Sequence, residues 1–84
     1  MEKIPVGKVT HYFGKAEVAA IALTGELKVG DRIEVETSEG PVQLTVGSMQ
    51  INRQPVQSAG AGQAVGIKVS GKVRENNSVF KLTE

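Results

Sequence analysis

The stretch that decides the fold is residues 31–46, Asp-Arg-Ile-Glu-Val-Glu-Thr-Ser-Glu-Gly-Pro-Val-Gln-Leu-Thr-Val. Isoleucine and valine alternate with charged residues in its first half, and valine and leucine alternate with polar residues in its second half. A period of two is typical of β-strands that bury one face. Between the halves, Ser38-Glu39-Gly40 suits a short hairpin connection, because glycine adopts positive φ without strain. The stretch therefore predicts two antiparallel strands joined by a tight turn.

Outward from this hairpin the same alternation continues. Immediately after Val46 the apolar phase slips by one residue, and this predicts a β-bulge near Gly47-Ser48 that bends one long strand around a corner. No window shows an apolar stripe at helical spacing. Four further segments are predicted as strands: 4–13, 17–24, 65–69 and 78–82.

This pattern predicts an all-β fold for residues 1–84 as one domain. About six or seven short strands, a bulge and frequent glycine favour a small closed antiparallel β-barrel. Closure is favoured because an open sheet of this length would expose unpaired edges. A β-sandwich is the structural alternative.

Composition excludes several kinds of site. The chain has no cysteine and one histidine, so we expect no disulfide, no metal site and no cofactor. The first residues show no apolar run after a basic one, and no segment approaches the ~20 apolar residues of a membrane span. We expect a soluble, cytoplasmic protein without a membrane partner.

Catalysis is not expected either, because no nucleophile and base can be paired from the sequence. His11 is a lone histidine, and Asp31 after a glycine suits a turn residue that accepts backbone hydrogen bonds. Glu34 and Glu36 share one strand face and are expected to be solvated. The Gly60–Gly62 loop lacks the Lys-Ser/Thr of a phosphate-binding loop, so no nucleotide is expected.

Charge is distributed unevenly although the net charge is only +1. Residues 25–40 carry five acidic side chains against two basic ones, a balance of −3. Residues 51–82 carry five basic side chains against one acidic one, a balance of +4. Basic side chains concentrated in this way would give the protein one positive face, which a phosphate backbone or an acidic protein would contact. An exposed ring from Tyr12-Phe13 could stack on a base. The candidate RNA- or partner-binding residues are Lys68, Lys72, Arg74, Tyr12 and His11.

Two segments carry a resemblance to a known family. Gly14–Ala19 followed by Gly25–Ile33, with its Val-Gly-Asp-Arg-Ile step, resembles the second domain of elongation factor Tu, and so does the strand entry at Ala59–Ile67. The resemblance runs from about Val6 to Leu82. More closely, Val65–Val69 and the Lys-Val-Arg that follows are similar to stand-alone elongation-factor-like barrels and to the barrel appended to collagenase-like peptidases.

The resemblance implies a closed barrel of the translation-factor domain 2 type. In the family this domain helps to dock the aminoacyl end of tRNA and touches ribosomal RNA. In this chain Ala19-Ala20-Ile21 replaces the family's Thr-Gly-Arg, which removes an arginine contact. Two functions follow as hypotheses. The first is a non-catalytic module that contacts RNA, the ribosome or tRNA through a basic rim, and the alternative is an accessory barrel that docks on a larger enzyme such as a collagenase-like peptidase.

Overall fold

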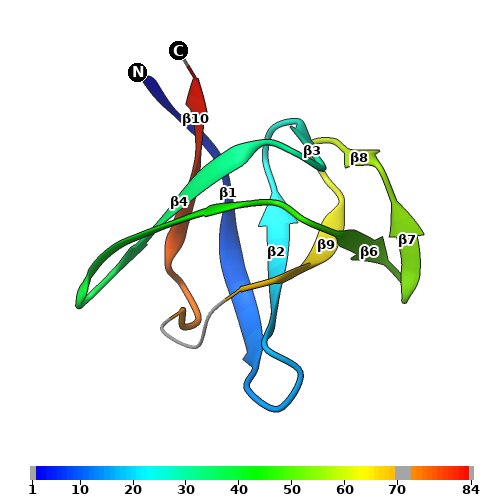
Figure 1. Cartoon of the computed structure of the whole chain (residues 1–84), viewed down its shortest axis with the longest axis horizontal. Helices are drawn as coiled ribbons and strands as arrows, with labels where there is room; N and C mark the ends of the chain where they lie inside the picture. The colour runs from blue at the N-terminus through cyan, green and yellow to red at the C-terminus, as the bar shows by residue number, and fades with distance from the viewer. Residues whose placement is uncertain (1, 70–72, 84) are drawn as a thin grey trace.

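The computed structural model describes residues 2–69 and 73–83 and is built from β-strands (Figure 1). All strand pairs in this part of the chain are antiparallel. Eight strands form one sheet in the order β5-β4-β10-β1-β2-β9-β6-β7, and β3 and β8 form a separate two-stranded ribbon. The strands are β1 (Glu2–Phe13), β2 (Val18–Leu23), β3 (Leu27–Lys28), β4 (Arg32–Thr37), β5 (Gly40–Thr45), β6 (Met49–Ile51), β7 (Gln54–Val56), β8 (Ser58–Ala59), β9 (Ala64–Lys68) and β10 (Ser78–Thr83).

The all-β prediction is confirmed, but the prediction of a closed barrel with six or seven strands is wrong. Residues 2–69 and 73–83 form ten strands, and among them the edge strands β5 and β7 do not pair with each other. After β5 the backbone of Val46 bonds to the β3–β4 turn, donating to the Asp31 carbonyl at 2.9 Å and accepting from the Gly30 amide at 2.8 Å. The chain then leaves the sheet at Gly47–Ser48 and pairs again only as β6. The predicted bulge is therefore a break between two strands.

The core lies on the concave side of this sheet and is almost entirely aliphatic. Alternate residues of β2 and β9 point into it, as the predicted period of two requires. Fully burying a side chain of this size stabilises the fold by roughly 1.5–3 kcal/mol. The buried apolar residues are Val6, Val9, Ala19, Ile21, Leu23, Leu27, Ile33, Val35, Val46, Met49, Ala59, Val65, Ile67, Val69, Val73 and Val79.

Strand β1 is the longest element and carries two register irregularities, at Pro5/Gly7 and at Val9/His11. Each extra residue reverses which side chains face the core. Val9 is fully buried and Tyr12 packs against the core, although an unbroken strand would place these two residues on opposite faces. Phe13 is therefore turned outward and is 51% exposed. The exposed ring of the Tyr12-Phe13 pair is thus that of Phe13, whereas Tyr12, the candidate binding residue, packs against the core.

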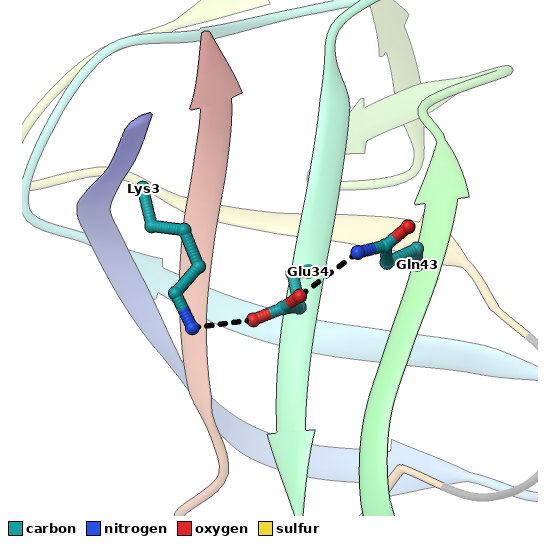
Figure 2. Close-up of polar contacts among 3 residues, drawn as sticks. All are labelled: Lys3, Glu34 and Gln43. Carbon is teal, nitrogen blue, oxygen red and sulfur yellow. Dashed lines mark hydrogen bonds and ion pairs between the residues drawn. The ribbon is translucent and has the colours of Figure 1, made fainter. Parts of the chain in front are cut away.

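Glu34 corrects a second expectation, because it is buried with a relative exposure of 5%. It lies on the outer face of β4, where Phe80 and Gln43 stand directly opposite it on the neighbouring strands. Lys3 Nζ forms an ion pair with Glu34 Oε2 at 2.8 Å, and Gln43 Nε2 donates to Oε1 at 3.0 Å (Figure 2). The alternation of β4 identified the face correctly but could not show that side chains of distant strands cover it.

These contacts also set the protonation of the two charged groups. The hydrogen bond from Gln43, followed by that from Lys3, lowers the pKa of the Glu34 carboxyl against the opposing effect of desolvation. The hydrogen bond to Glu34 raises the pKa of the Lys3 ammonium group. Lys3 also lies 5.2 Å from the centre of the Phe80 ring, within cation–π range. Both groups of the pair therefore remain charged over a wider pH range than in an unfolded chain.

Within residues 2–69 and 73–83 there is no helix long and apolar enough to cross a membrane.

Candidate binding groove

A shallow hollow lies on the outer face of the sheet, over strands β2, β9 and β6. Its floor consists of small residues at outward-facing positions. Ala20 of β2 stands opposite Gly66 of β9, and Ala64 lies two residues before Gly66 on the same face of β9. Gly66 is in turn opposite Gln50 of β6. Since polar or bulky side chains normally occupy the solvent face of such strands, this run of small residues leaves a depression in the surface.

Larger side chains border the depression, which we call the β2–β9 groove. Phe13 from the end of β1 and Val18 from β2 stand on one side, and the β6–β7 hairpin stands on the other. The groove has a volume of about 460 Å³, within the usual range for ligand sites. Its lining residues are Phe13, Ala16, Val18, Ala20, Gln50, Asn52, Arg53, Ala64, Val65 and Gly66.

The β6–β7 hairpin places Arg53 at the groove. Ile51 pairs with Gln54, so Asn52 and Arg53 are the two central residues of the turn. Their φ angles are 52° and 66°, and positive φ at both positions is the signature of a type I′ turn. Asparagine is well suited to the first position, whereas glycine is strongly preferred at the second. Arg53 therefore occupies a turn position whose backbone conformation favours glycine.

The residues predicted as a binding site fall into two groups. His11, Tyr12 and Arg74 lie together, because the turn before β10 docks on β1 through the bonds Asn76 N to Val9 O and Val9 N to Asn77 O. Tyr12, Val73, Arg74 and Glu75 line a second depression of about 340 Å³. These residues come from the two ends of the sequence and meet near the C-terminal end of β1.

The His11 side chain contacts two neighbouring side chains, Glu75 and Phe13. Its Nδ1 lies 3.1 Å from Glu75 Oε1, and its ring meets that of Phe13 edge-on with the centroids 4.4 Å apart. The side chains of His11 and Glu75 are 53% and 59% exposed, so water weakens the interaction between them. We interpret the His11–Glu75 pair as a surface contact that orients the His11 ring against the Phe13 ring.

Lys68 belongs to the other group. It pairs with Val18, which pairs with Phe13, so these residues form one row across the outer face beside the β2–β9 groove. Lys72 lies outside the described residues. That Lys68, Lys72 and Arg74 bind one ligand together stays a prediction.

Sequence reasoning missed the groove itself. A signal was present, because Ala20, Ala22, Ala64 and Gly66 all occupy positions of the alternating pattern where a polar residue is expected. The pair Asn52-Arg53 between two short apolar segments was a second signal, since asparagine favours the left-handed region of a turn. Neither signal could show that the two strands lie side by side.

The lining of the groove is mainly apolar. Arg53 is its one charged lining residue in the part of the chain that the structure describes. Across residues 2–69 and 73–83 no group of three or more His, Cys, Asp or Glu side chains is placed to hold a metal ion. The groove thus offers apolar contact and one cation.

Comparisons with known proteins agree with this architecture. The chain is 41% identical over 83 residues to an uncharacterized protease of Methanocaldococcus jannaschii, and 33% identical over 83 residues to a collagenase of Porphyromonas gingivalis. These matches cover 98% and 96% of this chain but only 20% of either relative, so the chain spans about a fifth of their length.

A solved structure has the same fold. The C-terminal domain of a protein of Geobacillus thermoleovorans assigned to the U32 peptidases superposes with a TM-score of 0.86, at 18% identity, over 96% of this chain and 93% of that domain. The family model for elongation factor Tu domain 2 matches residues 18–79, which include β2, β4 and β9 and therefore the floor of the groove. The chain thus belongs to the elongation factor Tu domain 2 family.

Proposed function

We propose that this chain is a non-catalytic accessory module that binds protein on behalf of a U32-type peptidase. The observation that carries the proposal is the β2–β9 groove, an apolar hollow with one cation and no acid–base pair among its lining residues. Similarity to one fifth of a protease and of a collagenase supports the peptidase context. In such a protein the catalytic groups would come from the rest of the chain, and this module would contribute binding.

A chimera tests this function. In the P. gingivalis collagenase, the fifth of the chain that matches is replaced by this sequence, and a deletion of the same segment serves as the control. We expect the chimera to hydrolyse soluble collagen faster than the deletion variant. The 84-residue chain alone should release no peptide from collagen. Equal rates for the chimera and the deletion variant would contradict the accessory role, and hydrolysis by the isolated chain would contradict its non-catalytic character.

Contact with RNA or the ribosome is the second candidate. It is favoured by the exposed Lys68 and Arg74, and by the +4 balance of residues 51–82. Fluorescence anisotropy with a short single-stranded RNA is the test. If Lys68 contacts a phosphate, Lys68→Gln should weaken binding and reduce the slope of log K against log salt by about 0.7. Arg32→Gln, which removes a charge from exposed β4, is the matched control. Binding that does not change with salt would exclude this candidate.

A further inference from the structure

We propose that the β2–β9 groove binds an acidic polypeptide segment, in which one bulky apolar side chain enters the groove and a neighbouring Asp or Glu pairs with Arg53. This inference rests on the proposed function, because it names the chemistry of the protein that the accessory module would bind. It assigns Arg53 as the residue that selects the ligand.

The apolar part of the ligand follows from the shape of the groove. Ala20, Ala64 and Gly66 form a floor without long side chains, and Phe13 stands beside it with half of its surface in water. At Gly66 even a methyl group would lie 3.2 Å from Val18 Cγ1, closer than ordinary contact, so glycine keeps this part of the floor open. A bulky side chain from another molecule would cover both the floor and the exposed ring.

The acidic part of the ligand follows from Arg53. Arg53 has a positive φ of 66°, which strains the backbone of any residue other than glycine. Such strain persists where the surrounding structure imposes it, and often where the side chain has a function. None of the ion pairs formed by the described residues involves Arg53. The groove therefore presents a planar guanidinium group that has no carboxylate partner among residues 2–69 and 73–83, and guanidinium binds carboxylates with two parallel hydrogen bonds.

The surroundings favour a side-chain ligand over an added strand. The neighbouring edge strand β7 has Pro55 at its centre, opposite Gln50. Proline has no amide hydrogen to donate, so it discourages another strand from pairing at that edge. A nucleic-acid strand is also disfavoured inside the groove, because one lining cation contacts few phosphates.

The test is an NMR titration of the isotope-labelled 84-residue chain with the peptide acetyl-Gly-Gly-Leu-Glu-Gly-Gly-amide. We expect the amide signals of Ala20, Ala64, Gly66 and Arg53 to shift, with a dissociation constant no weaker than about 1 mM. Because Arg53 is exposed, replacing glutamate by glutamine in the peptide should weaken binding by up to about fivefold. Replacing leucine by glycine should abolish the shifts. No shifts at these four residues, or equal binding of all three peptides, would overturn the proposal.

Variants of the chain separate binding from folding. Ala20→Leu fills the groove from an outward position, so it should abolish binding while the melting temperature stays within a few degrees of that of the wild type. Arg53→Gly creates the preferred Asn-Gly turn, so it should raise the melting temperature by about 4–8 °C and still weaken peptide binding by up to about fivefold. Arg32→Gln is the control for the loss of one charge. Wild-type affinity in Arg53→Gly would refute the role of Arg53.

A short single-stranded RNA forms the last arm of the test. If RNA shifts the four groove signals and the acidic peptide does not, the ligand is RNA and the proposal is wrong. In the collagenase chimera, Ala20→Leu should lower collagen hydrolysis toward the rate of the deletion variant. An unmodified chimera that works, combined with an Ala20→Leu chimera that works equally well, would refute the groove and leave the accessory role standing. An inactive unmodified chimera would refute the accessory role, while the peptide titration would still decide the groove.

Discussion

Gly7 is the position where the structure predicts the largest effect from the smallest change. It pairs with Val79 of β10 on one side and with Leu23 of β2 on the other, next to the first irregularity of β1. A methyl group added at Gly7 would lie 2.6 Å from the carbonyl oxygen of Ala22 and 2.9 Å from Ile21 Cγ2. Reaching the 3.4 Å of ordinary contact with that oxygen requires a movement of about 0.8 Å, the difference between 3.4 and 2.6 Å. Because the oxygen belongs to the backbone, β2 itself would have to move away from β1.

Forcing extra atoms into such a contact costs about 1–3 kcal/mol of unfolding free energy. In a chain of this size we expect Gly7→Ala to lower the melting temperature by roughly 4–8 °C for each kcal/mol lost. Gly47→Ala is the matched control, because a methyl group there meets nothing within 4 Å and the φ angle is not positive. That variant should gain about 0.4–1 kcal/mol through the reduced entropy of the unfolded chain. Thermal and urea denaturation followed by circular dichroism measures both effects. A Gly7→Ala variant as stable as the wild type would refute the close packing of β1 on β2.

Three further predictions concern the core and the two members of the Lys3–Glu34 pair. Ile67 is fully buried, so Ile67→Ala should cost about 2–5 kcal/mol in urea denaturation, whereas Ile4→Ala, at 43% exposure, should stay within about 0.5 kcal/mol of the wild type. The pKa of Glu34 is lowered in the folded state, so its stabilising contribution is complete above the unfolded value of 4.5 and is lost as the pH falls through the folded value. The wild type should therefore lose more stability than Glu34→Gln when melting temperatures at pH 6 and pH 3 are compared, and parallel losses would contradict the lowered pKa. The pKa of Lys3 is raised, so its contribution is complete below 10.5 and is lost as the pH rises through the folded value, and this alkaline loss should be absent in Lys3→Met.

Local alternation was sufficient to predict which residues are buried in the central strands. Ile33, Val35 and Ile67 are buried as expected, because side chains on one face of a strand recur at every second position whatever the partner strand is. The turn chemistry also transferred well. Asp31 Oδ2 accepts a hydrogen bond from the Lys28 amide at 2.9 Å, and Gly40 has the positive φ expected of it, 117°.

What could not be predicted depends on contacts between distant parts of the chain. Closure of the barrel requires pairing between the edge strands β5 and β7, and no local pattern encodes whether the residues between them allow it. Glu34 was expected to be solvated because a strand pattern shows a face but not what covers it, and Lys3 is 31 residues away in sequence. The contact between His11 and Glu75 spans 64 residues. The groove likewise depends on β2 and β9 being neighbours.

The pairing of β1 with β10 has a mechanical consequence. Glu2 stands opposite Thr83, so the start of β1 and the end of β10 lie at the same end of this pair (Figure 1). Tension applied between the two ends would pull the strands apart sideways, so the hydrogen bonds of the ladder would carry the load one after another and not together. Hydrogen bonds that break one after another require less force than hydrogen bonds that must break together. If the ends were anchored to two bodies that move apart, β1 and β10 would separate first, and the core beneath them would open to water.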